Sequence, residues 1–172
     1  MKHLRCSLYL FTPLTFLLFA CNSNNNTPAA QATIDSLTKQ VQTLKATQQQ
    51  LETNKKMVAD FYQQLFGDKD VSVIDKYISD PYIQHNPILP DGKEPLKEAC
   101  TKWFKGLPKE KIDIQHLSAE DNLVYIHTKE VHPGIKTVSV MDIFKIENGK
   151  IVEHWDLGQD VPEKSANPHP MF

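Results

Sequence analysis

The stretch from Ser139 to Gln159 constrains the fold of this chain more than any other feature of its sequence. From Val138 to Glu147 the chain contains two alternating sets of residues: Val138, Val140, Asp142, Phe144 and Ile146, and between them Ser139, Met141, Ile143, Lys145 and Glu147. Such a period of two predicts a β-strand. Asn148-Gly149 follows and is the strongest short-range signal for a hairpin turn. A second strand is expected from Ile151 to Leu157. These features predict an antiparallel hairpin near the end of the chain.

Asp142 lies among the apolar residues of the first of these strands. Burying a carboxylate without a partner costs several kcal/mol or raises its pKa, so Asp142 needs a structural partner or has a chemical role. The register of the hairpin decides which residue it meets. A two-residue turn places Asp142 opposite Trp155, and a three-residue loop with its glycine in a bulge places it opposite His154. Hydrophobicity alone does not choose between these registers.

The first 20 residues have the pattern of an export signal. Lys2, His3 and Arg5 precede an apolar run, residues 8–20, that is too short to span a membrane. The segment ends in Leu-Phe-Ala-Cys21, which resembles the lipobox of bacterial lipoproteins, although phenylalanine is not the usual residue there. The resemblance implies lipidation of Cys21 and a protein exported to the bacterial cell envelope and anchored to its membrane. An ordinary secretory signal or an uncleaved anchor is the alternative.

Residues 21–32 are polar and low in complexity, which predicts a flexible tether. A single helix is then expected from about Thr33 to Phe66, and its part over residues 33–53 is interpreted as a stalk. The apolar residues of this helix fit the a and d positions of a heptad, with Gln48 and Lys55 at two of the a positions. The stalk either pairs with another chain or serves only as an amphipathic spacer.

Residues 54–172 read as one globular domain. After the end of the first helix, two more helices are expected over residues 71–78 and 96–104, and strands are expected over residues 82–86, 112–117, 123–131, 137–146 and 151–157. Helices followed by a run of antiparallel strands predict an α+β domain with helices on one face of a sheet.

Charge and cysteine content bear on nucleic-acid binding and on disulfide bonds. The net charge of −2 and the lack of a basic run give no nucleic-acid signature. Cys100 lies on the apolar stripe of its helix and is expected in the core, so no disulfide is predicted within the mature chain.

The domain resembles the SnoaL-like branch of the nuclear transport factor 2-like superfamily. Three motifs carry the resemblance: Tyr82-Ile-Gln-His-Asn-Pro87, Asp142-Ile-Phe-Lys145, and the run from Asn148 to Asp156. The resemblance implies a cone-shaped barrel: a curved, mainly antiparallel sheet wrapped around helices, with a pocket at its open end.

The family also suggests roles for the carboxylates. In SnoaL-like polyketide cyclases, the aspartate that matches Asp156 is the acid/base group of an intramolecular aldol condensation. In ketosteroid isomerase, which shares the cone, the aspartate that matches Asp142 stays protonated and donates a hydrogen bond to the substrate oxyanion. The positions that match Asp142, His154 and Asp156 face the pocket in these relatives, which favours the three-residue loop. The general base of ketosteroid isomerase has no counterpart in this chain, and the cyclases are cytoplasmic.

Asp156, Asp142 and His154 are therefore the candidate catalytic residues, with a buried structural pair of Asp142 and His154 as the alternative. The candidate ligand-binding residues are His85, Asn86, His127, Tyr62 and Trp103. His154 and Asp156 could join His85 or His127 in a metal site. No spacing in the sequence is a specific metal signature, however, so neither a metal nor another cofactor is expected.

Three functions remain open from the sequence. The first is a cofactor-independent lyase or isomerase that acts on a small carbonyl compound, with Asp156 as general base. The second is an anchored module that binds a small molecule without turning it over. The third is an assembly domain, because Met141, Ile143 and Trp155 give the sheet an apolar outer face on which a homodimer is expected to form.

Overall fold

A computed structural model of the protein describes residues 27–132 and 134–172. The predicted signal segment, Cys21 and residues 22–26 of the predicted tether lie outside these described residues. The chain divides into two compact units, one that ends at Gln40 and one that runs from Val41 to Phe172. The sheet and the candidate site belong to the second unit.

The first helix, α1, runs over Pro28–Tyr62 and starts earlier than predicted, so residues 28–32 are helical rather than part of a flexible tether. It continues into a wider helical turn, η1, over Gln63–Gly67. Val58, Phe61 and Tyr62 near the end of α1 are buried. Among the described residues, no helix is both long enough and apolar enough to cross a membrane.

Two short helices and one strand follow. Helix α2 spans Val73–Tyr77, strand β1 spans Ile78–Gln84, and helix α3 spans Lys93–Trp103. Strand β1 begins four residues earlier than predicted, because it pairs with the last strand from Ile78 onward. This pairing is parallel, so the sheet is mixed.

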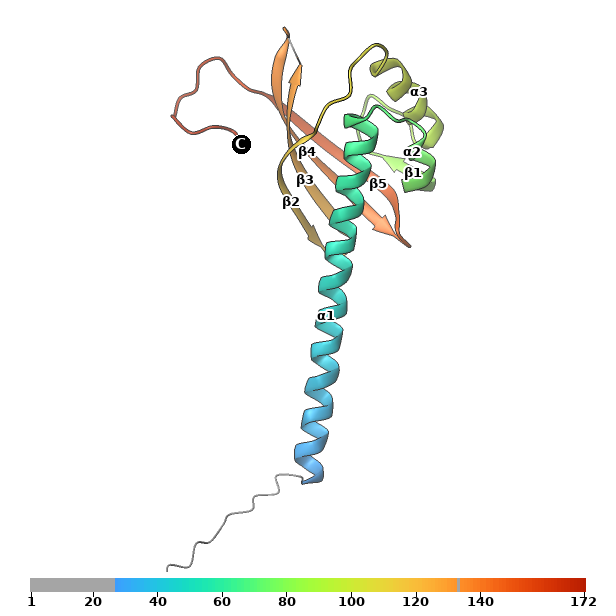
Figure 1. The fold of residues 1–172 in the computed structure, drawn as a ribbon, viewed down its shortest axis with the longest axis vertical. Helices are drawn as coiled ribbons and strands as arrows, with labels where there is room; N and C mark the ends of the chain where they lie inside the picture. Colours follow the sequence, from blue (N-terminus) through green and yellow to red (C-terminus); the bar gives the residue numbers. More distant parts are fainter. Residues whose placement is uncertain (1–26, 133) are drawn as a thin grey trace, which may run out of the picture. The chain divides into compact units, whose positions relative to one another are not determined.

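The other four strands are β2 (Asp113–Glu120), β3 (Leu123–His132), β4 (Lys136–Glu147) and β5 (Lys150–Asp160). The sheet has five strands in the order β1-β5-β4-β3-β2, and its antiparallel part curves beside the end of α1 (Figure 1). Buried residues of α1, α2, α3 and the concave face of the sheet form one hydrophobic core, which includes Cys100 as predicted. The predicted α+β fold is confirmed.

The hairpin of β4 and β5 has neither of the registers weighed from the sequence. Asn148 and Gly149 form a two-residue turn with φ values of 50° and 72°, the positive values that such hairpin turns require. A bulge then shifts the register between Ile146 and Lys145. Asp142 consequently lies opposite Asp156 rather than Trp155 or His154, and Phe144 lies opposite His154.

The bulge determines which side chains face the core. Ile151, before the bulge, and His154, after it, are both buried although they are three residues apart. In a regular strand, residues three apart point to opposite faces. The extra residue therefore lets an apolar side chain near the turn and the polar side chains beyond it share the concave face.

Candidate functional site

The concave face of the sheet and the helices beside it surround a cavity of about 830 Å³. Aromatic and aliphatic side chains form most of its wall, among them Phe61, Leu65, Phe66, Leu96, Phe104 and Val140. The side chains of Asp142, His154 and Asp156 also line the cavity. An apolar cavity with a few polar groups is the usual form of a small-molecule site.

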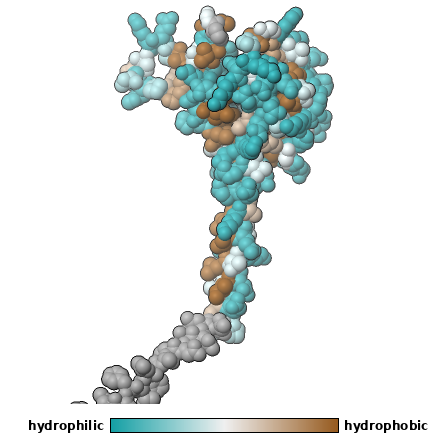
Figure 2. All heavy atoms as spheres, in the orientation of Figure 1, coloured by the Kyte–Doolittle hydropathy of each residue, from teal (hydrophilic) through white to brown (hydrophobic). Residues whose placement is uncertain are grey.

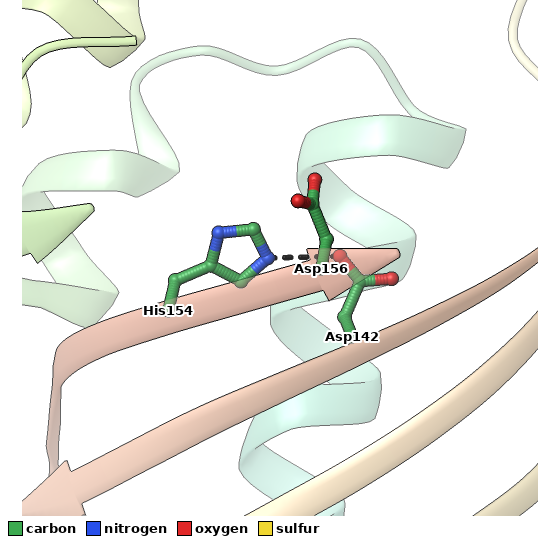
Figure 3. A group of neighbouring side chains, drawn as sticks. All are labelled: Asp142, His154 and Asp156. Atoms are coloured by element: carbon green, nitrogen blue, oxygen red, sulfur yellow. Dashed lines mark hydrogen bonds and ion pairs between the residues drawn. The ribbon is translucent and has the colours of Figure 1, made fainter. Parts of the chain in front are cut away.

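Asp142 comes from β4, and His154 and Asp156 come from β5, the neighbouring strand (Figure 3). Their ligand-type atoms all lie within 4.8 Å of one another. Asp142 and His154 are only 4% and 8% exposed, whereas Asp156 is half-buried. The three predicted catalytic residues thus lie together on one cavity wall.

Asp142 and His154 share a proton. The Nε2 atom of His154 lies 2.9 Å from Oδ1 of Asp142, and its Nδ1 atom lies 2.9 Å from Oε1 of Gln84. The backbone N–H of Asn86 also donates to that Gln84 oxygen, so Nδ1 must carry a proton and donate it. The second contact needs one more proton, which is either on Nε2 or on the carboxyl. In both forms the pair has no net charge.

Tyr62 approaches the same carboxyl from α1. Its hydroxyl lies 3.0 Å from Oδ2 of Asp142 and 3.1 Å from Oε1 of Glu130. A phenol has one proton and can donate it to only one of these groups. Both contacts are hydrogen bonds only if one of the two carboxyls brings its own proton.

The pKa shifts agree with this proton count. Burial raises the pKa of Asp142, against the opposing effects of its bonds to His154 and Tyr62. Burial and the nearby Asp142 carboxylate also raise the pKa of Glu130. Burial and the same two carboxyls raise the pKa of Tyr62 well above its ordinary value. The phenol therefore stays protonated, and the carboxyls beside it hold protons more tightly than in water.

Asp156 has a different environment. Both of its oxygens accept hydrogen bonds from Nδ2 of Asn86, at 2.8 and 2.7 Å. The backbone N–H of Ile88 donates to the Asn86 side-chain oxygen, which fixes the orientation of the amide. Accepting at both oxygens suits an ionised carboxylate. The site thus combines an acceptor, Asp156, with a neutral pair that holds a proton.

The other predicted ligand-binding residues divide into two groups. Tyr62, Asn86 and Trp103 line the cavity. His85 and His127 do not, which corrects the expectation for both. His85 follows Gln84, whose side chain faces His154, so the imidazole of His85 lies toward the other face, where it stacks on Trp155 and contacts Glu153.

His127 belongs to a polar cluster on the convex face. Its neighbours on β3, Ile126 and Thr128, are buried on the concave face, so alternation directs His127 outward. Its Nε2 atom lies 2.7 Å from the hydroxyl of Ser139, and its Nδ1 atom lies 2.9 Å from Nδ1 of His116.

Gln84, which orients His154, and Glu130, which contacts Tyr62, also belong to the site but were not among the residues predicted from the sequence. Both could have been found by alternation. Gln84 is two residues before Asn86 in the family-like motif, and Glu130 is two residues after Thr128 on β3.

Asp142, His154 and Asp156 are also the one group of potential metal ligands found within the part of the chain that the structure describes. The carboxyl oxygens are already hydrogen-bonded to His154, Tyr62 and Asn86. A metal ion would have to displace these partners. The prediction of no metal stays a prediction.

The fold resembles many solved structures. A nuclear transport factor 2-like protein of unknown function from Burkholderia xenovorans has a TM-score of 0.54 and 17% identity, over 67% of this chain and 89% of that one. A candidate polyketide cyclase from Acidithiobacillus ferrooxidans has a TM-score of 0.52 and 20% identity, over 62% and 87%. An epoxide hydrolase-like protein of M. tuberculosis has a TM-score of 0.52 and 14% identity, over 64% and 85%. At these identities the likeness concerns the fold alone.

No curated protein matches the sequence significantly. The sequence model for SnoaL-like polyketide cyclases, in contrast, matches residues 56–163, which is more than half of the chain. This match includes α2, α3, the whole sheet and the three polar residues of the cavity. The chain therefore belongs to the SnoaL-like polyketide cyclase family.

Proposed function

We propose that the protein is a cofactor-independent acid/base enzyme that binds a small carbonyl compound in its cavity and removes a proton beside the carbonyl group. One observation carries the proposal: an acceptor carboxylate and a neutral, proton-holding pair share one wall of a largely apolar cavity. Abstraction of such a proton requires a base at the carbon and a hydrogen-bond donor at the oxygen that becomes negative.

Asp156 is the base. Its carboxylate accepts the proton from carbon, and Asn86 holds both of its oxygens in place. The new electron pair moves onto the carbonyl oxygen and forms an enolate. The enolate can then attack a second carbonyl, as in an aldol condensation, or take the proton back at another carbon, as in an isomerisation.

Asp142 is the donor to the enolate oxygen. It carries the proton that it shares with His154, and this proton can turn to a ligand oxygen as negative charge develops there. His154 and Tyr62 orient the carboxyl from its two sides. Because the pair is neutral beforehand, it does not repel the charge that forms.

Proton exchange tests this assignment before the natural substrate is known. Small cyclic ketones in D₂O, followed by nuclear magnetic resonance, report removal of the proton beside the carbonyl. Asp156→Asn keeps the shape of the side chain and should lower the enzyme-dependent rate by about a hundredfold to ten-thousandfold. Asp160→Asn, at the exposed end of the same strand, is the matched control and should not change the rate. Equal rates for the wild type and Asp156→Asn would refute the role of Asp156 as base.

A binding module without turnover is the second candidate. The predominance of aromatic and aliphatic side chains in the cavity wall favours it, since such a wall binds apolar ligands whether or not they react. An apolar fluorescent probe that binds wild type and Asp156→Asn equally, together with no proton exchange in either, would favour this candidate over the enzyme.

We also propose that the protein is exported and held at the bacterial cell envelope by a lipid on Cys21. The support is the sequence: a basic start, a short apolar run and a cysteine directly after Ala20. Cys21→Ser should move the protein from the membrane fraction to the soluble fraction. Mass spectrometry that finds an unmodified Met1 would contradict the proposal.

We also propose that the protein forms a homodimer through the convex face of the sheet. Ile143 lies opposite Trp155, and Met141 lies opposite Leu157, so two apolar cross-strand pairs adjoin on this face. Leu157 is 65% exposed. Ile143→Lys in the full chain should weaken self-association about tenfold, which is about 1.4 kcal/mol, in analytical ultracentrifugation. An unchanged association constant would exclude this face.

A further inference from the structure

Helix α1 carries a stripe of large apolar side chains that are exposed to solvent. Ile34, Leu37, Val41 and Leu44 are 51%, 54%, 48% and 69% exposed. Brown, hydrophobic residues follow one another along the helix in Figure 2. Contiguous apolar surface of this kind is uncommon on a monomer and marks an interaction site.

The spacing of the stripe identifies the kind of partner. Ile34, Val41, Gln48 and Lys55 occupy a positions, and Leu37, Leu44, Leu51 and Val58 occupy d positions, which is an uninterrupted heptad pattern. Val58 at its end is fully buried in the domain core, and Leu51 is half-buried. The domain therefore covers the last d position fully and the one before it in part, and it leaves Ile34, Leu37, Val41 and Leu44 exposed. The earlier positions keep a 3.5-residue period of apolar residues. A helix with this period packs against another helix that has the same period.

We propose that residues 34–51 of α1 form a parallel, two-stranded coiled coil with the same segment of a second copy of this chain. β-Branched residues at a and leucine at d favour two parallel strands, and this segment has Ile34 and Val41 at a and Leu37, Leu44 and Leu51 at d. Gln48 is the polar a residue. In a parallel pair in register it meets its own copy, with which it can form a side-chain hydrogen bond, and this fixes the alignment.

The flanking positions favour a second copy over a different, charged partner. Positions e and g of a coiled coil select partners through their charges. Here they hold mainly threonine and glutamine, and Lys45 and Glu52 are the only charged residues among positions 33–52 at e or g. A parallel pair places Lys45 across from Gln40, and Glu52 across from Thr47, so no like charges meet. The helix thus lacks a charge pattern that would require a partner of opposite charge.

Contacts within α1 indicate where the coiled coil ends. Glu52 forms an ion pair with Lys55 at 2.9 Å and accepts one N–H of Gln48 at 2.8 Å, which leaves the second N–H and the oxygen of the Gln48 amide for its copy. These contacts hold the side chain of Lys55 along its own helix. The coiled coil consequently ends near Leu51, just before the residues of α1 that pack into the domain.

Cysteine cross-linking of the full chain tests the pairing and its direction. Leu37→Cys and Leu44→Cys place a thiol at d positions, where identical residues of a parallel pair come close enough for a disulfide. Ala46→Cys, at the outward f position of the same helix, is the matched control. All variants contain the same native cysteines, so any difference between them comes from the new thiol.

Both d-position variants should form the disulfide-linked dimer at least about tenfold faster than Ala46→Cys at equal protein concentration, because the coil raises the local thiol concentration. Leu44→Lys in the Leu37→Cys background should remove this advantage. Equal rates at positions 37, 44 and 46 would overturn the pairing. Cross-linking at 44 without cross-linking at 37 would overturn the parallel alignment.

Discussion

The two faces of the sheet each hold histidine-centred polar residues, but the two groups differ in what surrounds them. On the concave face, His154 meets a buried carboxyl, and both line a cavity. On the convex face, His127 meets His116 and Ser139, with no carboxylate among its hydrogen-bond partners, and it does not line the cavity. A ligand can reach only the first group from the cavity. The comparison separates a histidine that is bonded to a carboxyl in the cavity wall from histidines that are bonded to each other and to a serine outside it.

The largest effect is expected from removing the carboxyl of the concave group. Asp142→Ala leaves the hydroxyl of Tyr62 and the ring of His154 without their shared partner. Breaking a buried, hydrogen-bonded pair costs about 3–5 kcal/mol. Urea unfolding should show this loss of stability, whereas Asp142→Asn should lose less because it keeps the volume. A loss below about 1 kcal/mol for Asp142→Ala would show that the pair is not a buried unit.

The second effect concerns Glu130, which faces Tyr62 of α1, Asp142 of β4, His132 of β3 and Glu110. The pKa of Glu130 lies above the ordinary value of 4.5 in the folded protein, chiefly because its half-buried carboxyl is partly removed from water. A raised carboxyl pKa gives stability that is present in full at low pH and is lost as the pH rises through the folded pKa. Glutamine at this position cannot titrate.

Glu130→Gln should therefore gain stability relative to the wild type as the pH is raised from about 4.5 to neutral. The measurement is urea unfolding of both proteins at several pH values. Asp142 has a raised pKa in both proteins, so its contribution largely cancels in the difference. A difference that is constant or falls with pH would mean that Glu130 is ionised at least as easily in the folded state as in the unfolded state.

The smallest effect is expected on the convex face. Ser139→Ala removes the hydroxyl that lies 2.7 Å from Nε2 of His127. A hydrogen bond between uncharged groups contributes about 0.5–1.5 kcal/mol. Unfolding experiments should find a loss within this range, and ketone proton exchange should be unaffected. A slower exchange rate in this variant would connect the convex group to the cavity and weaken the comparison.

Much of the fold could be predicted because it depends on local periodicity. The hairpin turn followed from Asn148-Gly149, and the helices followed from their apolar spacing. The register of the hairpin could not be predicted in this way. It depends on the bulge in β5, which allows both Ile151 and His154 to be buried, and on the pairing of β5 with β1. These are interactions between distant segments, which a local pattern does not contain.

The orientation of the histidines, in contrast, was open to a local argument. The grouping of Asp142, His154 and Asp156 followed from the resemblance to the family, whose pocket residues match these positions. His85 and His127 were also candidate pocket residues, His85 because its short strand reaches the pocket in the cone-shaped fold. Strict alternation after Gln84 and Ile126 would have directed both of them to the convex face.

The most direct test of the central claim is a matched pair of variants, His154→Gln and His127→Gln, in the ketone proton-exchange assay. Both replace a buried imidazole by an uncharged amide, and circular dichroism checks that each variant is folded. His154→Gln should slow exchange by about a hundredfold, because Asp142 loses the partner with which it shares a proton, whereas His127→Gln should leave the rate unchanged. Equal rates in the two variants would contradict the assignment of acid/base chemistry to the concave face.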